Sequence, residues 1–260
     1  MKTWRAVLAI VGGTFVEAIR NRLLLLSALF ALVLVGLSVS AASVSIGEQS
    51  RLIVDVGLAA ASALGSAIAL ALSVSSFAGE LRRRTAYAVL ARPVSRWVFV
   101  LGKYLGVVLA MALLVALMVL ATAAVVWLYG DSVPAALWGS LWLTLVEMAV
   151  VVAVGTLFST LATPMLAAAY AGGVVLAGNL AADLRDLALE LAKKGEGGAP
   201  LVEWGYYLLP DLQKLSLRTQ AANDLPVSLE YLALGSAYGA AYATAALVLA
   251  MWVFTRRRSV

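Results

Sequence analysis

The 260-residue sequence contains neither cysteine nor histidine. Without cysteine, the chain cannot form a disulfide bond, a thiolate metal site or a Cys-His nucleophilic pair. Without histidine, imidazole metal ligands and a Ser-His pair are also excluded. A metal site made of carboxylates alone stays possible, but the acidic residues form no cluster with suitable spacing. We therefore expect no catalytic residue and no metal in this chain.

Charged residues are also scarce. They make up 13% of the chain, whereas soluble proteins carry about 25%. Hydrophobic residues make up 63%, and the mean hydropathy is +0.97. These residues come in unbroken blocks instead of the alternating or amphipathic patterns of a globular core. The sequence therefore predicts an all-α membrane protein.

Six apolar blocks are long enough for a transmembrane helix, which needs about 17–25 residues, and the third is longer than a bilayer needs. We expect a single transmembrane domain over residues 1–260, with six spans and a partly helical outer loop at residues 183–226. The expected spans are residues 23–40, 56–77, 98–129, 135–157, 165–182 and 229–254. The outer loop begins with apolar residues at helical spacing, and the sequence GEGGAP at Gly195–Pro200 breaks that helix.

Residues 1–22 differ from a membrane span. Apolar residues recur at i, i+4, i+7 and i+11, so one face of a helix over residues 2–20 is apolar. These residues are Trp4, Leu8, Val11 and Phe15. The basic residues of the segment can stay among the lipid headgroups, so we expect a helix that lies in the membrane interface. The residues after the short apolar run are charged, so the segment does not resemble a cleaved signal peptide.

The basic residues predict the orientation of the chain. Thirteen of the nineteen lysines and arginines fall in the N-terminal segment, the connection at residues 79–103 and the C-terminal tail. Basic residues favour the cytoplasmic side of a membrane. We therefore expect a multi-pass protein of the cell inner membrane with both termini in the cytoplasm. Since topology accounts for the basic charge, we expect no nucleic-acid partner.

The connection at residues 79–97 is the most specific segment. Leu81–Leu90 can form a short helix, which Pro93 and Ser95 would end with a turn. That helix would present its basic residues to the cytoplasm and could dock on a soluble partner. The alternative is an ordinary basic loop of the kind found in most helical membrane proteins.

The segment GELRRRTAYAVLARPVSRWVFVLGKYLG, residues 79–106, resembles the ABC type-2 exporter permeases. In that family an acidic residue precedes a Thr-bearing helix, an Arg-Pro-x-Ser-Arg turn follows, and a Gly-Lys pair opens the next span. The resemblance extends to the six-span plan and implies a coupling helix that sits in a groove of an ATP-binding subunit. The residues implied in coupling are Glu80, Arg82, Arg83, Arg84, Thr85, Tyr87, Arg92, Pro93, Ser95 and Arg96.

The resemblance also implies the partners. The chain lacks the G-x-x-x-x-G-K-[ST] phosphate loop, because the Gly102-Lys103 pair is followed by Tyr104. It therefore binds no cofactor, and ATP and Mg would sit on a separate ABC ATPase subunit. A family-type exporter pairs two such subunits with two permease chains, identical or different. The stretch Gly205–Arg218 resembles the outer loop of members linked to copper-enzyme maturation, and the outer loop could contact a periplasmic protein.

Two other functions stay open. A non-transporting membrane anchor would pass force from an ATPase to an outer partner. A secondary transporter would show inverted repeats and half-helices broken by glycine or proline, and no persuasive repeat is present. The sequence identifies no substrate.

A few residues inside the expected spans are candidates for function or packing. Glu147 lies mid-span, where an ionisable side chain costs ~2.5–3.5 kcal/mol and is expected to face a partner or a wet cavity. Glu147 and Asn179 are therefore candidates for a translocation path, with hydrogen bonding inside the bundle as the alternative. Small residues let helices approach closely, either within one chain or between two chains. The candidates for such packing are Gly172, Gly173, Gly235 and Gly239.

Overall fold

The structure is a computed structural model. It describes residues 2–22, 24–25, 28–29, 33, 36, 49–83, 95–181, 183, 186–187, 193 and 209–256. Within these residues the regular elements are helices. They are α1 (Lys2–Ile19), α3 (Gln49–Arg83), α5 (Arg96–Leu128), α6 (Ala136–Leu161), α7 (Pro164–Asn179), the 3-10 turn η1 (Gln213–Leu215), α10 (Arg218–Ala222) and α11 (Leu229–Arg256).

Four of the described helices are long and apolar enough to cross a membrane: α3, α5, α6 and α11. The expectation of six spans is therefore matched only in part. The expected first span, residues 23–40, lies largely outside the described residues. The expected fifth span is α7, whose 16 residues extend ~24 Å, less than the ~30 Å of a bilayer's hydrocarbon core.

The second span is longer than expected. Helix α3 begins at Gln49 instead of Val56 and continues without a break to Arg83, past the expected end at Phe77. The segment around Gly79 contains no proline, and a single glycine in a helix costs only ~1 kcal/mol. The helix therefore continues into the stretch that we expected to be a loop followed by a separate helix. Its 35 residues give a length of ~52 Å.

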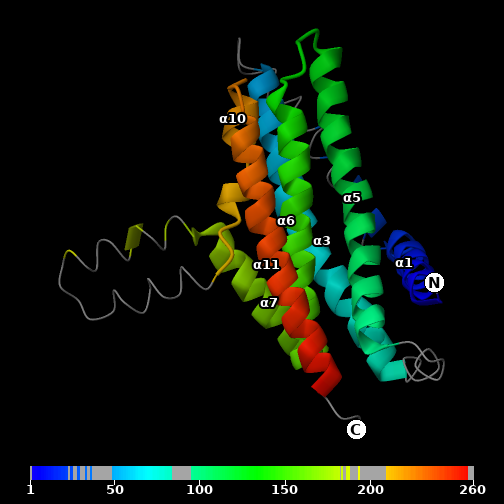
Figure 1. The fold of residues 1–260 in the computed structure, drawn as a ribbon. Helices are drawn as coiled ribbons and strands as arrows, with labels where there is room; N and C mark the ends of the chain where they lie inside the picture. Colours follow the sequence, from blue (N-terminus) through cyan, green and yellow to red (C-terminus); the bar gives the residue numbers. More distant parts are fainter. Residues whose placement is uncertain are drawn as a thin grey trace.

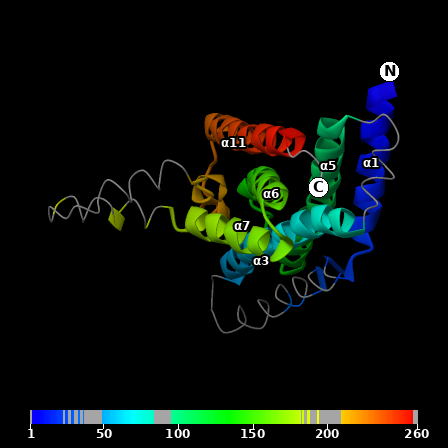
Figure 2. The ribbon, with the colours of Figure 1, turned by 90° about the horizontal axis from the view of Figure 1, so that it is seen from below.

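Helix α6 lies at the centre of the bundle. Figure 2, which looks along the bundle, shows α6 with α11 on one side and with α3 and α7 on the other. Its sequence is apolar on every face, and most of its residues are buried. A helix that is hydrophobic all round is stable only where other helices or lipid surround it. Helices α3, α5, α7 and α11 therefore pack around α6.

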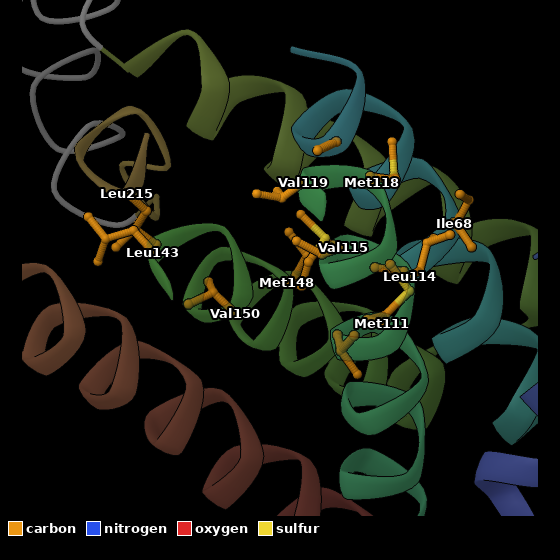
Figure 3. Close-up of a cluster of buried hydrophobic side chains, with 14 of the residues drawn as sticks. Ile68, Met111, Leu114, Val115, Met118, Val119, Leu143, Met148, Val150 and Leu215 are labelled. Atoms are coloured by element: carbon orange, nitrogen blue, oxygen red, sulfur yellow. The ribbon is translucent and has the colours of Figure 1, made fainter. Parts of the chain in front are cut away.

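Helices α3, α5 and α6 supply much of the buried core. Met111, Val115 and Met118 of α5 lie near Met148 of α6 (Figure 3), and all four are almost completely buried. Methionine is unbranched and adapts to irregular gaps between helices. Ile68 of α3 belongs to the same cluster. This contact joins the two helices that flank residues 84–94 to the central helix.

The two ends of the bundle differ in their elements. We call the end at which α3 ends and α5 begins the connection end, and the opposite end the cap end. Helix α11 also ends at the connection end, which is at the bottom in Figure 1. Helix α1 does not run along the bundle but lies crosswise outside α5 (Figures 1 and 2). The expected position of this helix in the membrane interface stays a prediction.

Candidate functional site

The residues expected to couple to an ATPase lie at the connection end. The backbone of Glu80, Arg82 and Arg83 forms the last turns of α3. Ser95 and Arg96 begin α5, where Ser95 is the N-cap with extended backbone and no side-chain capping bond. The other expected coupling residues lie outside the described residues. They are Arg84, Thr85, Tyr87, Arg92 and Pro93.

Arg96 joins α5 to α11. Its Nη1 atom donates to the carbonyl oxygens of Phe254 at 3.5 Å and Thr255 at 3.3 Å. These carbonyls belong to the last turn of α11, where intrahelical donors are missing and the helix dipole favours a cation. Phe99 of α5 stacks on Phe254 with ring centroids 6.0 Å apart. The start of α5 and the end of α11 are therefore tied together by two kinds of contact.

Two glycines let α1 lie directly against α5. A Cβ atom at Gly102 would come within 2.8 Å of the Cβ of Ile10, and one at Gly106 within 2.6 Å of the Cβ of Thr14. Real Cβ atoms essentially never approach so closely, so only glycine fits at these contacts. Since the two glycines are four residues apart, they form one notch on one face of α5. The Gly-Lys pair expected to open the span is thus the point where α1 crosses α5.

Lys103 lies in this crossing. Its side chain is 3% exposed, and its Nζ atom donates to Oε2 of Glu17 at 3.4 Å. Glu17 itself is 64% exposed, so the pair lies at the edge of the contact. An ammonium group is tolerated at such depth when an opposite charge compensates it. The pair therefore fixes the lengthwise register of α1 on α5.

Glu147 is buried within the protomer. Its side chain is 1% exposed and lies between α6 and α3, where Oε1 accepts hydrogen bonds from Ser62 at 2.8 Å and Ser66 at 3.4 Å. Its Oε2 atom has no hydrogen-bond partner within the described part of the chain. The two serines are four residues apart and share one face of α3. This carboxylate therefore links α3 to the central helix.

Asn179 lies apart from Glu147, at the end of α7. Its side chain is exposed, and its Nδ2 atom donates to the carbonyl of Val175 in its own helix at 3.0 Å. Its backbone carbonyl accepts a 2.6 Å bond from Gln213. In the described structure the two candidate path residues have different hydrogen-bond partners, since Glu147 bonds to α3 and the amide of Asn179 bonds within α7.

The four candidate packing glycines fall into two pairs. A Cβ at Gly235 would lie 3.2 Å from Leu143, and one at Gly239 would overlap Val146, so both glycines pack α11 against α6. A Cβ at Gly172 or Gly173 would meet no neighbouring atom within 4 Å among the described residues. Their expected packing role is therefore not met within this part of the protomer, because α7 buries a different face.

A short segment covers the bundle at the cap end. We call residues 209–226, which include η1 and α10, the cap segment. Leu212, Leu215 and Leu217 are at most 2% exposed and anchor it in the core. After α10, Asp224 adopts the left-handed conformation with φ 49°, which aspartate tolerates. The Leu225 N–H then donates to the carbonyl of Gln220, as in a Schellman motif.

Polar contacts hold the cap segment to α3 and α11. Arg218 donates two hydrogen bonds to Asp55 of α3, from Nε to Oδ1 at 2.5 Å and from Nη2 to Oδ2 at 2.6 Å. This bond to Asp55 raises the pKa of the Arg218 guanidinium, and partial burial opposes the increase. On the other side, Tyr231 of α11 donates to the carbonyl of Lys214 at 2.9 Å. Tyr238 of α11 accepts from the Asp211 N–H at 2.8 Å.

Sequence reasoning missed the residues that pair across the fold. From the sequence, Lys103 was placed in the basic connection and Glu17 was not singled out, and Ser62 and Ser66 were part of an apolar block. Ser62 and Ser66 do carry a signal, since two serines four residues apart in a membrane span predict a polar helix contact. No sequence signal pairs Asp55 with Arg218, because Arg218 lies 163 residues further along the chain.

These contacts offer mechanical connections between helices, with α3, α5, α1 and α11 meeting at the connection end. No curated protein matches the sequence. The family model described as "ABC-2 family transporter protein" matches residues 8–258, which is nearly the whole chain. The sequence segment that resembles this family is also the segment that joins α3 to α5 in the structure. The chain therefore belongs to the ABC-2 transporter family as a multi-pass membrane subunit.

Proposed function

We propose that this chain is the permease subunit of an ATP-driven exporter. Two copies, or this chain and a related one, pair with two separate ATPase subunits, which bind ATP and Mg. The family membership supports a membrane role that depends on an ATPase partner. The contacts at the connection end are the observation that carries the proposal. Through them, a displacement of residues 84–94 would be transmitted to several helices.

That route starts at the two helices that flank residues 84–94. Helix α3 enters the connection at Arg83, and α5 leaves it at Arg96. Through Arg96 the start of α5 holds the end of α11, and through Gly102 and Gly106 it holds α1. A displacement of the connection would therefore move α3, α5, α1 and α11 together. Closely packed helices transmit such displacements because protein interiors compress little.

The orientation follows from the charges at this end. The connection, the N-terminal helix and the C-terminal tail hold thirteen of the nineteen basic residues. We place this end in the cytoplasm of the cell inner membrane, where an ATPase can reach it. The cap segment then lies on the outer side, where it can contact the exported substrate or a periplasmic protein.

Co-purification tests the proposal. The full chain, tagged and captured in mild detergent, is expected to bring down an ATPase with a phosphate loop. Substitutions Glu80→Ala, Arg92→Ala and Arg96→Ala are expected to weaken capture about tenfold each, a loss of ~1.4 kcal/mol of binding. Arg5→Ala is the matched control, since Arg5 is an exposed basic residue on α1, outside the connection. Capture of no ATPase would contradict the proposal.

A second measurement separates transport from force transmission. The purified complex is reconstituted in liposomes, and ATP-dependent flux of candidate substrates is measured. Flux that stops when the ATPase is inactivated supports an exporter. ATP hydrolysis without flux, together with an outer protein that co-purifies, would instead support a membrane anchor that transmits force.

A further inference from the structure

The cap segment is attached to the bundle in two physically different ways. In the core it is held by the buried side chains of Leu212, Leu215 and Leu217 and by a hydrogen bond from the Leu212 N–H to the carbonyl of Gly178 in α7. Its contact with α3 includes the ion pair of Arg218 with Asp55, whose side chains are 46% and 35% exposed. Apolar burial persists while the core stays packed, whereas a partly exposed ion pair contributes little to stability and can open easily.

The geometry of the ion pair makes it specific in spite of its small energy. Nε and Nη2 of Arg218 contact the two different oxygens of Asp55, which is the planar fork arrangement. This arrangement forms only when the two groups lie in one plane at one separation. A small displacement or rotation of α3 would therefore break both hydrogen bonds together.

Helix α3 connects this pair to the opposite end of the bundle. The same unbroken helix carries Asp55 near the cap end and leads into residues 84–94 at the connection end. Midway, Ser62 and Ser66 tie it to Glu147 of α6 by hydrogen bonds. A second polar contact at the cap end joins Ser50 of α3 to Asp131 in the turn between α5 and α6. The start of α3 is thus held at the cap end by polar contacts.

From this arrangement we infer that Asp55 and Arg218 form a releasable latch between α3 and the cap segment. Movement of α3, started at the connection end, breaks the two hydrogen bonds and loosens α10, which packs against α3. The cap segment stays attached to α6 and α11 through its buried leucines and through Tyr231 and Tyr238. That ATP drives this movement rests on the proposed function. The latch itself involves only residues of this chain, so it can be tested without an ATPase.

The natural absence of cysteine allows a direct test in the full chain. Ala221 of α10 is fully buried, so Ala221→Cys reports opening of the cap segment through its rate of labelling by a water-soluble maleimide. We call this introduced thiol the reporter thiol. The protein is placed in nanodiscs, where both membrane faces are accessible. Thr219→Cys, at an exposed position of the same helix, serves as the control for reagent access.

Breaking the latch is expected to expose the reporter thiol. Asp55→Asn and Arg218→Gln should each raise its labelling rate about fivefold, and the swapped pair Asp55→Arg with Arg218→Asp should return it toward the original rate. Glu230→Gln removes an acidic charge at the same end of the bundle and should leave the rate unchanged. Unchanged labelling in both single variants, or a swapped pair that labels as fast as they do, would overturn the latch.

A second stage tests release by the ATPase. In the purified complex, a non-hydrolysable ATP analogue should raise labelling of the reporter thiol when Asp55 and Arg218 are intact. A short bifunctional thiol reagent that joins Asp55→Cys to Arg218→Cys should abolish the rise. A labelling rate that does not respond to nucleotide in the intact complex would overturn release by ATP. If no ATPase is captured, the proposed function fails, while the nanodisc experiment still decides on the latch.

Discussion

Lys103 of α5 directs its ammonium group toward α1, where Nζ lies 3.4 Å from Oε2 of Glu17. The lysine is almost fully buried and the glutamate is mostly exposed. Lys103 directly follows Gly102, which together with Gly106 lets α1 cross α5. The ion pair and the close contacts at the glycines therefore hold α1 at the same crossing on α5.

Glu17→Gln removes the carboxylate that faces the buried ammonium of Lys103. We expect the free energy of unfolding to fall by ~1 kcal/mol, a small value because Glu17 is well exposed. Lys103→Met removes the charge and keeps the apolar stem, so adding Glu17→Gln to it should cost nothing more. Thermal unfolding in detergent measures the cycle of single and double variants. Additive losses in the double variant would show that the two side chains do not interact.

Gly106→Ala places a methyl group against Thr14 and the carbonyl oxygen of Val11. Because a backbone oxygen cannot easily move away, we expect a loss of ~1–3 kcal/mol in stability. Gly13→Ala is the matched control, since Gly13 lies on α1 with no neighbour within 4 Å of an added Cβ in the described structure. The stability of the Gly13→Ala variant should be unchanged or rise by up to ~1 kcal/mol, because alanine has the higher helix propensity. Equal melting temperatures for the two variants would contradict the notch.

Glu147→Leu removes the acceptor for Ser62 and Ser66. Hydrogen bonds between membrane helices contribute ~0.6 kcal/mol each, whereas a carboxylate in the membrane costs ~2.5–3.5 kcal/mol. The second effect is larger, so we expect the unfolding temperature to stay the same or to rise. Glu147→Gln keeps an acceptor oxygen and should behave similarly.

If the carboxylate has a role in transport, both Glu147 variants should lower the ATP-driven activity of the complex although they are stable. ATP hydrolysis and flux in liposomes measure this activity at matched expression. Full activity in both variants would dismiss a functional role and leave Glu147 as a contact between α3 and α6.

Arg96→Gln removes the cation from the last carbonyls of α11. A cation at a helix C-terminus contributes ~0.3–1 kcal/mol, so amide exchange in the last turn of α11 should rise about two- to fivefold. Hydrogen-exchange mass spectrometry compares residues 250–256 with residues 236–242 of the same helix. Arg5→Gln, which changes an exposed arginine on α1, should leave both peptides unchanged. Equal acceleration in both peptides would indicate general loosening instead of a lost cap.

The sequence predicted the elements whose causes are local. Hydropathy placed α5, α6 and α11 within a few residues of their observed bounds, because each block must be apolar over its full length to lie in a bilayer. It was less accurate for α3, whose polar ends stay helical outside the apolar block. The fifth block was predicted as a span, and its helix ends early, at Asn179. Hydropathy reports where a chain can be buried, and it does not report where a helix starts or stops.

The order of residues at the α3–α5 connection allowed the family to be predicted, since a motif is read along the chain without any knowledge of packing. The pairs that hold the fold were decided only by the tertiary structure. Gly235 and Gly172 look alike in sequence, yet only the first faces a neighbouring helix in the described structure. Asp55 meets Arg218 because the start of α3 lies beside α10 of the cap segment. The rotation of each helix about its axis selects its partners, and that rotation is fixed when all the helices pack together around α6.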